Sequence, residues 1–181
     1  MNAETNRTKW VVDRAHSELS FKVKHLMITN VKGEFREFDA SVYTTGKDNM
    51  TSDIELSINP ASITTGDSQR DAHLKGADFF DVDNFNQINF SGKSFEKISD
   101  GTYVLHGDLQ MKGVKKPVSL DVEFGGLMKD PWGNEKAGFS VNGKINRKDW
   151  GLNWNAALET GGVLVSDEVK ISGDVQLVRA N

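Results

Sequence analysis

The sequence predicts an all-β protein, an antiparallel barrel or sandwich of about eight strands with one short helix. Apolar residues recur at every second position through most of the chain, which is typical of strands with one buried face. Short turns separate these segments, as antiparallel strands allow, whereas parallel strands would need crossover helices that the sequence does not supply. Only the segment 67–76 has the composition of a helix.

The alternating segments follow one another along the whole chain. The first covers 19–23, where apolar residues alternate with Ser and Lys. Between Phe35 and Phe38 the alternation slips by one residue, which predicts a β-bulge or a break. The later segments lie at 54–58, 88–90, 103–111, 118–124, 139–145 and 169–177.

The helical segment carries signals for both of its ends. Asp67 or Ser68 can cap the first turn, and Gly76 is a natural C-terminal stop. We therefore expect one short helix around 67–76.

Length and charge set broad limits. The 181 residues suit a single domain, which we place at 10–179 after a loosely held N-terminus at 1–9. The net charge of −4 argues against a nucleic-acid or anionic-membrane surface, because such a surface needs clustered positive charge. The absence of Cys excludes disulfides, thiolate nucleophiles and Cys-based metal sites.

Targeting signals are also missing from the sequence as written. No apolar stretch is long enough to span a membrane, and the first residues lack a signal-peptide pattern. We therefore expect a cytoplasmic protein, or a periplasmic one if a leader has been removed.

Glycines occupy apolar-phase positions in five of the expected strands, where a packed core would have Val, Ile or Leu. They are Gly33, Gly92, Gly107, Gly143 and Gly173. One interpretation is that the interior is left open for a ligand. The other is that inward glycines let the strands coil tightly, as barrel corners require. Both interpretations favour a strongly curved sheet.

Several motifs together resemble the YceI-like family of lipocalin-like, polyisoprenoid-binding proteins. The segment 13–25 (DRAHSELSFKVKH), continued by 31–35 (VKGEF), resembles the family's opening strands. The segments 62–65 (SITT), 70–74 (RDAHL) and 78–81 (DFFD) resemble its helical insertion. Its central hairpin and closing strands are similar to 107–118 (GDLQMKGVKKPV), 145–151 (INRKDWG) and 167–171 (DEVKI).

The resemblance implies an extended lipocalin-like barrel whose apolar channel holds a polyprenyl or quinone-like lipid, without a catalytic cofactor. It also implies a periplasmic or secreted location for many members and homodimers for some. The residues that we expect to line the channel are Phe21, Val23, Phe35, Ile54, Leu56, Ile58, Phe79, Phe80, Phe90, Leu109 and Phe139, with Gly107 and Gly143 providing clearance.

Polar residues offer weaker candidates. The histidines lie at 16, 25, 73 and 106, and no two have a metal-ligand spacing, so we expect no metal site. Arg70 and His73 share one helix face and could receive a lipid head group at the channel mouth. Alternatively, they fasten the helix to the sheet together with Asp71. For Arg147 and Asp149 an ion pair at a strand end is the favoured interpretation.

Two other classes of function remain open. The protein could be an enzyme that acts on a bound lipid or small molecule through His16, His73 or Arg70. It could also be a module that binds a protein partner, its barrel filled by its own side chains. The leading hypothesis is a non-enzymatic lipid carrier or store.

Overall fold

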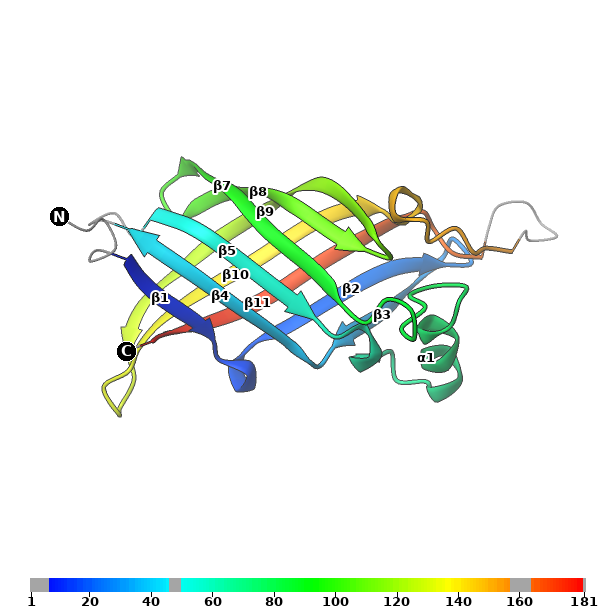
Figure 1. Ribbon diagram of the computed structural model, residues 1–181, viewed down its shortest axis with the longest axis horizontal. Coiled ribbons are helices and arrows are strands. Elements are labelled where there is room, and N and C mark those ends of the chain that lie inside the picture. Colours follow the sequence, from blue (N-terminus) through cyan, green and yellow to red (C-terminus); the bar gives the residue numbers. More distant parts are fainter. Residues whose placement is uncertain (1–6, 46–49, 157–163, 181) are drawn as a thin grey trace.

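The computed structural model describes residues 7–45, 50–156 and 164–180, which form an elongated β-barrel with one α-helix at one end (Figure 1). Helix α1 covers Ser68–Lys75, and the short 3-10 helices are η2 (Arg14–His16), η3 (Pro60–Ser62) and η4 (Arg147–Trp150). The strands are β1 (Arg7–Val12), β2 (Glu18–His25), β3 (Thr29–Phe35), β4 (Phe38–Thr45), β5 (Met50–Ile58), β6 (Ile63–Thr64), β7 (Ile88–Ser99), β8 (Thr102–Met111), β9 (Val114–Lys129), β10 (Glu135–Asn146) and β11 (Glu168–Arg179).

The barrel closes through β1. This strand pairs with β4 on one side and with β11 on the other, and the ring continues in the order β4, β5, β7, β8, β9, β10, β11. Every pairing is antiparallel, so the expected closed eight-stranded barrel is confirmed for the described residues. Closure leaves no free sheet edge around this ring.

Beyond β1, the barrel is extended by β2, β3 and β6. Strand β11 pairs with β2 over residues 170–174 and with β1 over 177–179, so β1 and β2 follow each other along the same edge. The predicted slip near Phe35 is a break, since β3 ends at Phe35 and β4 begins at Phe38. Because of this break, the side chains of both Phe35 and Phe38 face the interior.

Helix α1 forms where the sequence predicts it. The Asp67 carboxylate accepts hydrogen bonds from the backbone N–H groups of Gln69 and Arg70, at 3.0 and 3.2 Å. The helix ends at Lys75, and Gly76 follows it as the C-cap residue. We call the end of the barrel that carries α1 and the β2–β3 turn the α1 end, and the end that carries the β9–β10 turn the far end (Figure 1).

The ordered sheet begins earlier than the sequence suggested. Residues 7–9 were expected to be loosely held, yet they belong to β1 and pair with β4. Trp10 anchors this strand, since it is buried and its indole N–H donates to Thr44 Oγ1 at 3.2 Å. The expectation for residues 1–6 lies outside the described residues.

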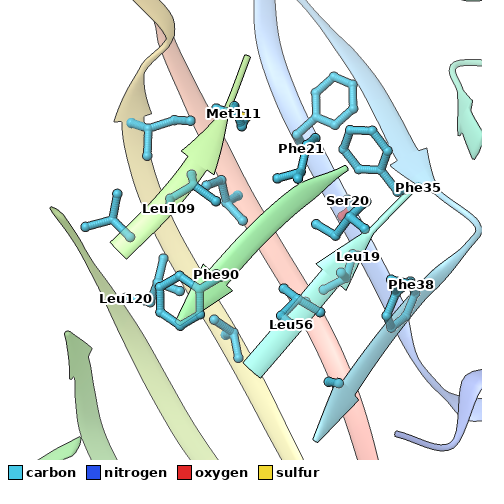
Figure 2. Close-up of a pocket in the computed structure, with 18 of the residues that line it drawn as sticks. Leu19, Ser20, Phe21, Phe35, Phe38, Leu56, Phe90, Leu109, Met111 and Leu120 are labelled. Carbon is cyan, nitrogen blue, oxygen red and sulfur yellow. The ribbon is translucent and has the colours of Figure 1, made fainter. Parts of the chain in front are cut away.

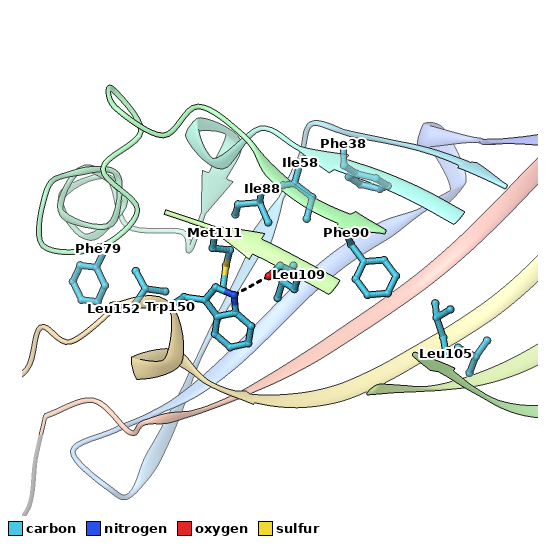
Figure 3. Packing of buried hydrophobic residues seen from close by; sticks show 11 residues of the cluster. Phe38, Ile58, Phe79, Ile88, Phe90, Leu105, Leu109, Met111, Trp150 and Leu152 are labelled. Atoms are coloured by element: carbon cyan, nitrogen blue, oxygen red, sulfur yellow. Dashed lines mark hydrogen bonds between the residues drawn. The ribbon is translucent and has the colours of Figure 1, made fainter. Parts of the chain in front are cut away.

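The best-packed part of the interior lies towards the α1 end. Trp150 is 2% exposed, and its indole N–H donates to the Leu109 carbonyl at 2.9 Å (Figure 3). Ile58, Ile88 and Met111 are buried in the same cluster. Among the described helices, none has the length and apolar character needed to cross a membrane.

Candidate ligand cavity

A cavity of about 280 Å³ lies inside the barrel. Its lining consists of inward-facing side chains from β2 to β5 and β7 to β11, together with residues next to α1 (Figure 2). Apart from Ser20 and Arg147, every residue of this lining is apolar. Such an interior favours a hydrocarbon guest over a polar one, because an unpaired polar group would be costly to bury there.

The cavity follows the length of the strands. On β11 the lining residues alternate from Val169 to Leu177, eight residues apart, which is roughly 26 Å at about 3.3 Å per residue. On β10 they run from Phe139 to Ile145. The cavity therefore suits a long, narrow molecule better than a compact one.

All of the apolar side chains predicted for the channel belong to this lining. They are Phe21, Val23, Phe35, Ile54, Leu56, Ile58, Phe79, Phe80, Phe90, Leu109 and Phe139. For the residues on strands, phase was sufficient to identify them, because alternate side chains of a barrel strand point inward. Phe79 and Phe80 lie outside the strands, after α1, and came from the family resemblance. Their contact with a ligand stays a prediction.

The inward glycines act differently from the expected clearance. A Cβ on Gly107 would lie 2.5 Å from Phe90 Cζ and also against the Ser91 carbonyl oxygen, and a Cβ on Gly143 would lie 2.5 Å from Leu120 Cδ2. Neither glycine belongs to the lining, whereas Phe90 and Leu120 do. Each missing Cβ thus leaves room at the barrel wall for a neighbouring lining side chain, Phe90 at Gly107 and Leu120 at Gly143.

Aromatic rings dominate the lining at the α1 end. Phe35 lies between Phe21 and Phe80, with ring centroids 5.7 Å from each. Phe79 packs against Trp154 at 5.3 Å. The Phe rings come from β2, β3 and the segment after α1, and Trp154 comes from the segment after η4, so the fold joins parts that lie far apart in the sequence.

Arg70 lies outside the cavity lining and fastens α1 to the sheet. Its guanidinium donates to Thr65 Oγ1 at 2.8 Å and to the Thr65 carbonyl at 3.0 Å. Asp71 accepts from the same threonine at 2.6 and 2.8 Å. Burial alone would raise the pKa of Asp71, but the hydrogen bonds from Thr65 outweigh burial and lower it. These contacts are those of the interpretation in which Arg70 and Asp71 fasten α1, with Thr65 as their shared partner.

His73 also lies outside the lining. Its Nε2 is 2.9 Å from Asp78 Oδ2, and its ring stands edge-on to Phe79 and Trp154. His16 lies in η2 and contacts Asp13 at 2.9 Å. The residues proposed for the enzymatic alternative, Arg70, His73 and His16, therefore have separate partners and are not gathered at one site.

Arg147 is the polar lining residue that sequence reasoning placed wrongly. It is 3% exposed, and it donates to the backbone carbonyls of Leu152 at 2.5 Å and of Ser166 at 2.9 Å. Among the described residues it forms no ion pair with Asp149. Burial lowers the pKa of Arg147, while the charge of Asp167 opposes that shift. Arg147 directly follows β10 and continues the inward phase of Phe139, Val141 and Ile145, so the alternation points to burial, and only its charge argued against it.

The family model described as "YceI-like domain" matches residues 10–177. The chain belongs to the YceI-like family. UPF0312 protein SAS2572 of Staphylococcus aureus is 42% identical over 170 residues, which cover 93% of this chain and 96% of that protein. The resemblance noted from the motifs is thereby confirmed.

Three solved structures have a similar fold. A Campylobacter jejuni YCEI protein is 33% identical, with a TM-score of 0.75 over 94% of this chain and 97% of that one. Burkholderia cenocepacia BcnA shares 23% identity and a TM-score of 0.79, over 91% and 98% of the chains. A polyisoprenoid-binding domain from Saccharophagus degradans shares 14% identity and a TM-score of 0.65, over 94% and 98%. The last two similarities concern the fold alone.

Proposed function

We propose that this protein binds one long-chain isoprenoid lipid, polyprenyl or quinone-like, in the barrel cavity and thereby stores or carries it. The observation that carries the proposal is the cavity itself, an apolar lining that follows β11 from Val169 to Leu177. Membership of the YceI-like family supports it, and so does the similarity in fold to the polyisoprenoid-binding domain of S. degradans.

Apolar burial suffices for useful affinity. Each methylene removed from water contributes about 0.8 kcal/mol, so one five-carbon isoprene unit contributes on the order of 3–4 kcal/mol. A few units give roughly micromolar binding or better after several kcal/mol of immobilisation cost. The aromatic side chains at the α1 end add flat surfaces against which the branched chain packs.

We infer that binding proceeds without a catalytic step. Two of the side chains that the sequence suggested for catalysis form hydrogen bonds outside the cavity, His73 with Asp78 and Arg70 with Thr65. Neither side chain belongs to the cavity lining. A lipid in the cavity is surrounded mainly by hydrocarbon, which stabilises it and gives no group for proton transfer.

Tail length provides the test. Lipid-depleted protein is titrated with benzoquinones that carry increasing numbers of isoprene units, and binding is followed by quenching of tryptophan fluorescence. We expect the affinity to rise at least about tenfold per unit until the cavity is full. An affinity that does not depend on tail length would contradict the proposal.

A further inference from the structure

The turn between β2 and β3 exposes three consecutive apolar side chains. Leu26, Met27 and Ile28 are 40%, 58% and 80% exposed. Leu26 and Met27 also have positive φ values, 55° and 62°, in a tight hairpin position where Asn-Gly is usual. The left-handed backbone is strained for Leu and Met, and the exposed apolar side chains are unfavourable in water. The turn is therefore poorly adapted to solvent. We call residues 26–28 the apolar tip.

The tip is held firmly in this position. Its Leu26 N–H donates to the Leu164 carbonyl at 2.9 Å, and His25 pairs with Val165. The neighbouring segment thus supports the hairpin from one side. Figure 1 shows the turn at the α1 end of the barrel. The cavity residues Phe21 and Val23 lie on β2, the strand that leads into the turn.

Just behind the tip, the sheet register places four lysines in one row. Lys144 lies opposite Lys170, Lys170 opposite Lys22, and Lys22 opposite Lys32, on the adjacent strands β10, β11, β2 and β3. All four side chains are exposed. Like charges directly opposite each other destabilise a sheet, so the four lysines do not stabilise the fold, and we look for a binding role for them. We call these residues the lysine row.

The row keeps uncompensated positive charge. Its outer members have acidic partners, Lys32 with Glu18 at 3.5 Å and Lys144 with Glu168 at 4.0 Å. Its inner members, Lys22 and Lys170, form no ion pair with any carboxylate of the described residues. Lys24, one position from the end of β2, has none either within that part of the chain.

The acidic residues near α1 lie on a different segment. Asp67 and Asp71 belong to the start of α1, and Asp78, Asp81 and Asp83 follow the helix, where Asp78 contacts His73 and Asp81 contacts Asn84. On the strands of the row itself, Glu18 and Glu168 pair with the outer lysines, Glu34 pairs with Arg36, and Asp174 accepts a hydrogen bond from Ser140. The inner lysines, Lys22 and Lys170, therefore carry the positive charge that the row presents to solvent, although the whole chain has a net charge of −4.

The distance between the apolar tip and the lysine row suits the surface of a bilayer. Lys22 lies four residues before Leu26, so the row is roughly 13 Å behind the first residue of the tip at about 3.3 Å per residue. Interfacial segments bury their apolar side chains about 5–10 Å into the headgroup boundary and keep Lys near the headgroups. Anionic headgroups attract such a basic band, whereas an apolar tip gains nothing from a soluble polyanion.

We propose that the apolar tip and the lysine row dock this end of the barrel on membranes that contain anionic phospholipids. Docking brings the cavity end lined by Phe21 and Val23 close to the bilayer, from which an isoprenoid can pass into the barrel. The passage of ligand rests on the proposed function, whereas docking itself does not depend on it.

Sedimentation with vesicles tests the docking. The full chain is mixed with vesicles of phosphatidylcholine alone or with about 30% phosphatidylglycerol, at low and high salt. We expect binding to the anionic vesicles only, and its loss at high salt. Each near-surface lysine contributes roughly a fivefold gain, so Lys22→Gln with Lys170→Gln should lower binding on the order of 20-fold.

The tip is tested with Met27→Asn and Ile28→Ser, because Asn tolerates the left-handed backbone at residue 27. This variant should also bind at least several-fold more weakly. Matched controls come from the far end: Met128→Ser with Trp132→Ser removes exposed apolar side chains, and Lys9→Gln with Lys129→Gln removes the same charge. Circular dichroism verifies the fold of each variant, and both controls should bind as the wild type does.

Several results would overturn the docking proposal. They are equal binding to neutral and anionic vesicles, no vesicle binding at all, or an equal loss in the far-end controls. Binding to DNA or polyglutamate without binding to anionic vesicles would assign the lysine row to another anionic partner. A protein that docks but takes up no isoprenoid would refute the proposed function and leave the docking intact.

Discussion

Ala40 offers a direct way to fill the cavity. It lies on β4, belongs to the cavity lining, and already directs a Cβ into the interior, so no backbone shift is needed. Ala40→Leu adds three carbon atoms to the lumen. At about 0.8 kcal/mol per displaced methylene, the loss is about 2.4 kcal/mol, or roughly 60-fold weaker binding of an isoprenoid quinone.

The neighbouring residue supplies the control. Ser41 follows on the same strand, outside the cavity lining, and its cross-strand neighbours are Val11 and Glu55. Because successive side chains of a strand point to opposite faces, Ser41→Leu adds the same carbons outside the barrel. Quinone titration should show wild-type affinity for Ser41→Leu, with thermal unfolding unchanged within a few degrees for both variants. A folded Ala40→Leu protein that binds as tightly as the wild type would refute a ligand in this cavity.

Three further perturbations test contacts that stabilise the fold. Gly107→Ala should lower the free energy of unfolding by about 1–3 kcal/mol in urea, because its Cβ would overlap neighbouring atoms, whereas Gly138→Ala, with open space around it, should be neutral or slightly stabilising. Arg147→Met removes the donors to the backbone carbonyls and should destabilise by about 3 kcal/mol in the same assay; an unchanged midpoint would contradict a structural role. The hydrogen bond from Lys136 lowers the pKa of Asp13, so this carboxylate stabilises the fold above its ordinary pKa of 3.8 and loses that effect as the pH falls through the lower folded value. Lys136→Met should therefore start acid unfolding at a higher pH, seen by circular dichroism, and an unshifted acid transition would count against it.

The fold could be predicted largely from local pattern. Alternation of apolar residues gave the strand faces, and the slip between Phe35 and Phe38 gave the break between β3 and β4. The start of β1 was missed because residues 7–9 are polar and alternate weakly, and pairing with β4 holds them in the sheet. Closure could not be derived from pattern alone, since a sandwich presents the same alternation.

Residues whose position follows from alternation along one strand could be predicted as part of the site. Contacts that depend on how neighbouring strands are paired could not. The apolar lining follows from alternation, whereas the role of Gly107 depends on which side chain the neighbouring strand places against it. The lysine row shows the same limit. Lys144 and Lys22 are far apart in the sequence, and only the order of strands reveals a positive cluster that the net charge conceals.

The most direct measurement is the content of the barrel after purification. Organic extracts of the folded protein, purified without detergent from bacterial cells, are analysed by mass spectrometry alongside the intact protein under native conditions. A lipid guest in the cavity predicts about one isoprenoid molecule per chain, and much less in Ala40→Leu than in Ser41→Leu. A wild-type protein that carries no lipid, and that takes up none when isoprenoids are supplied, would contradict the account.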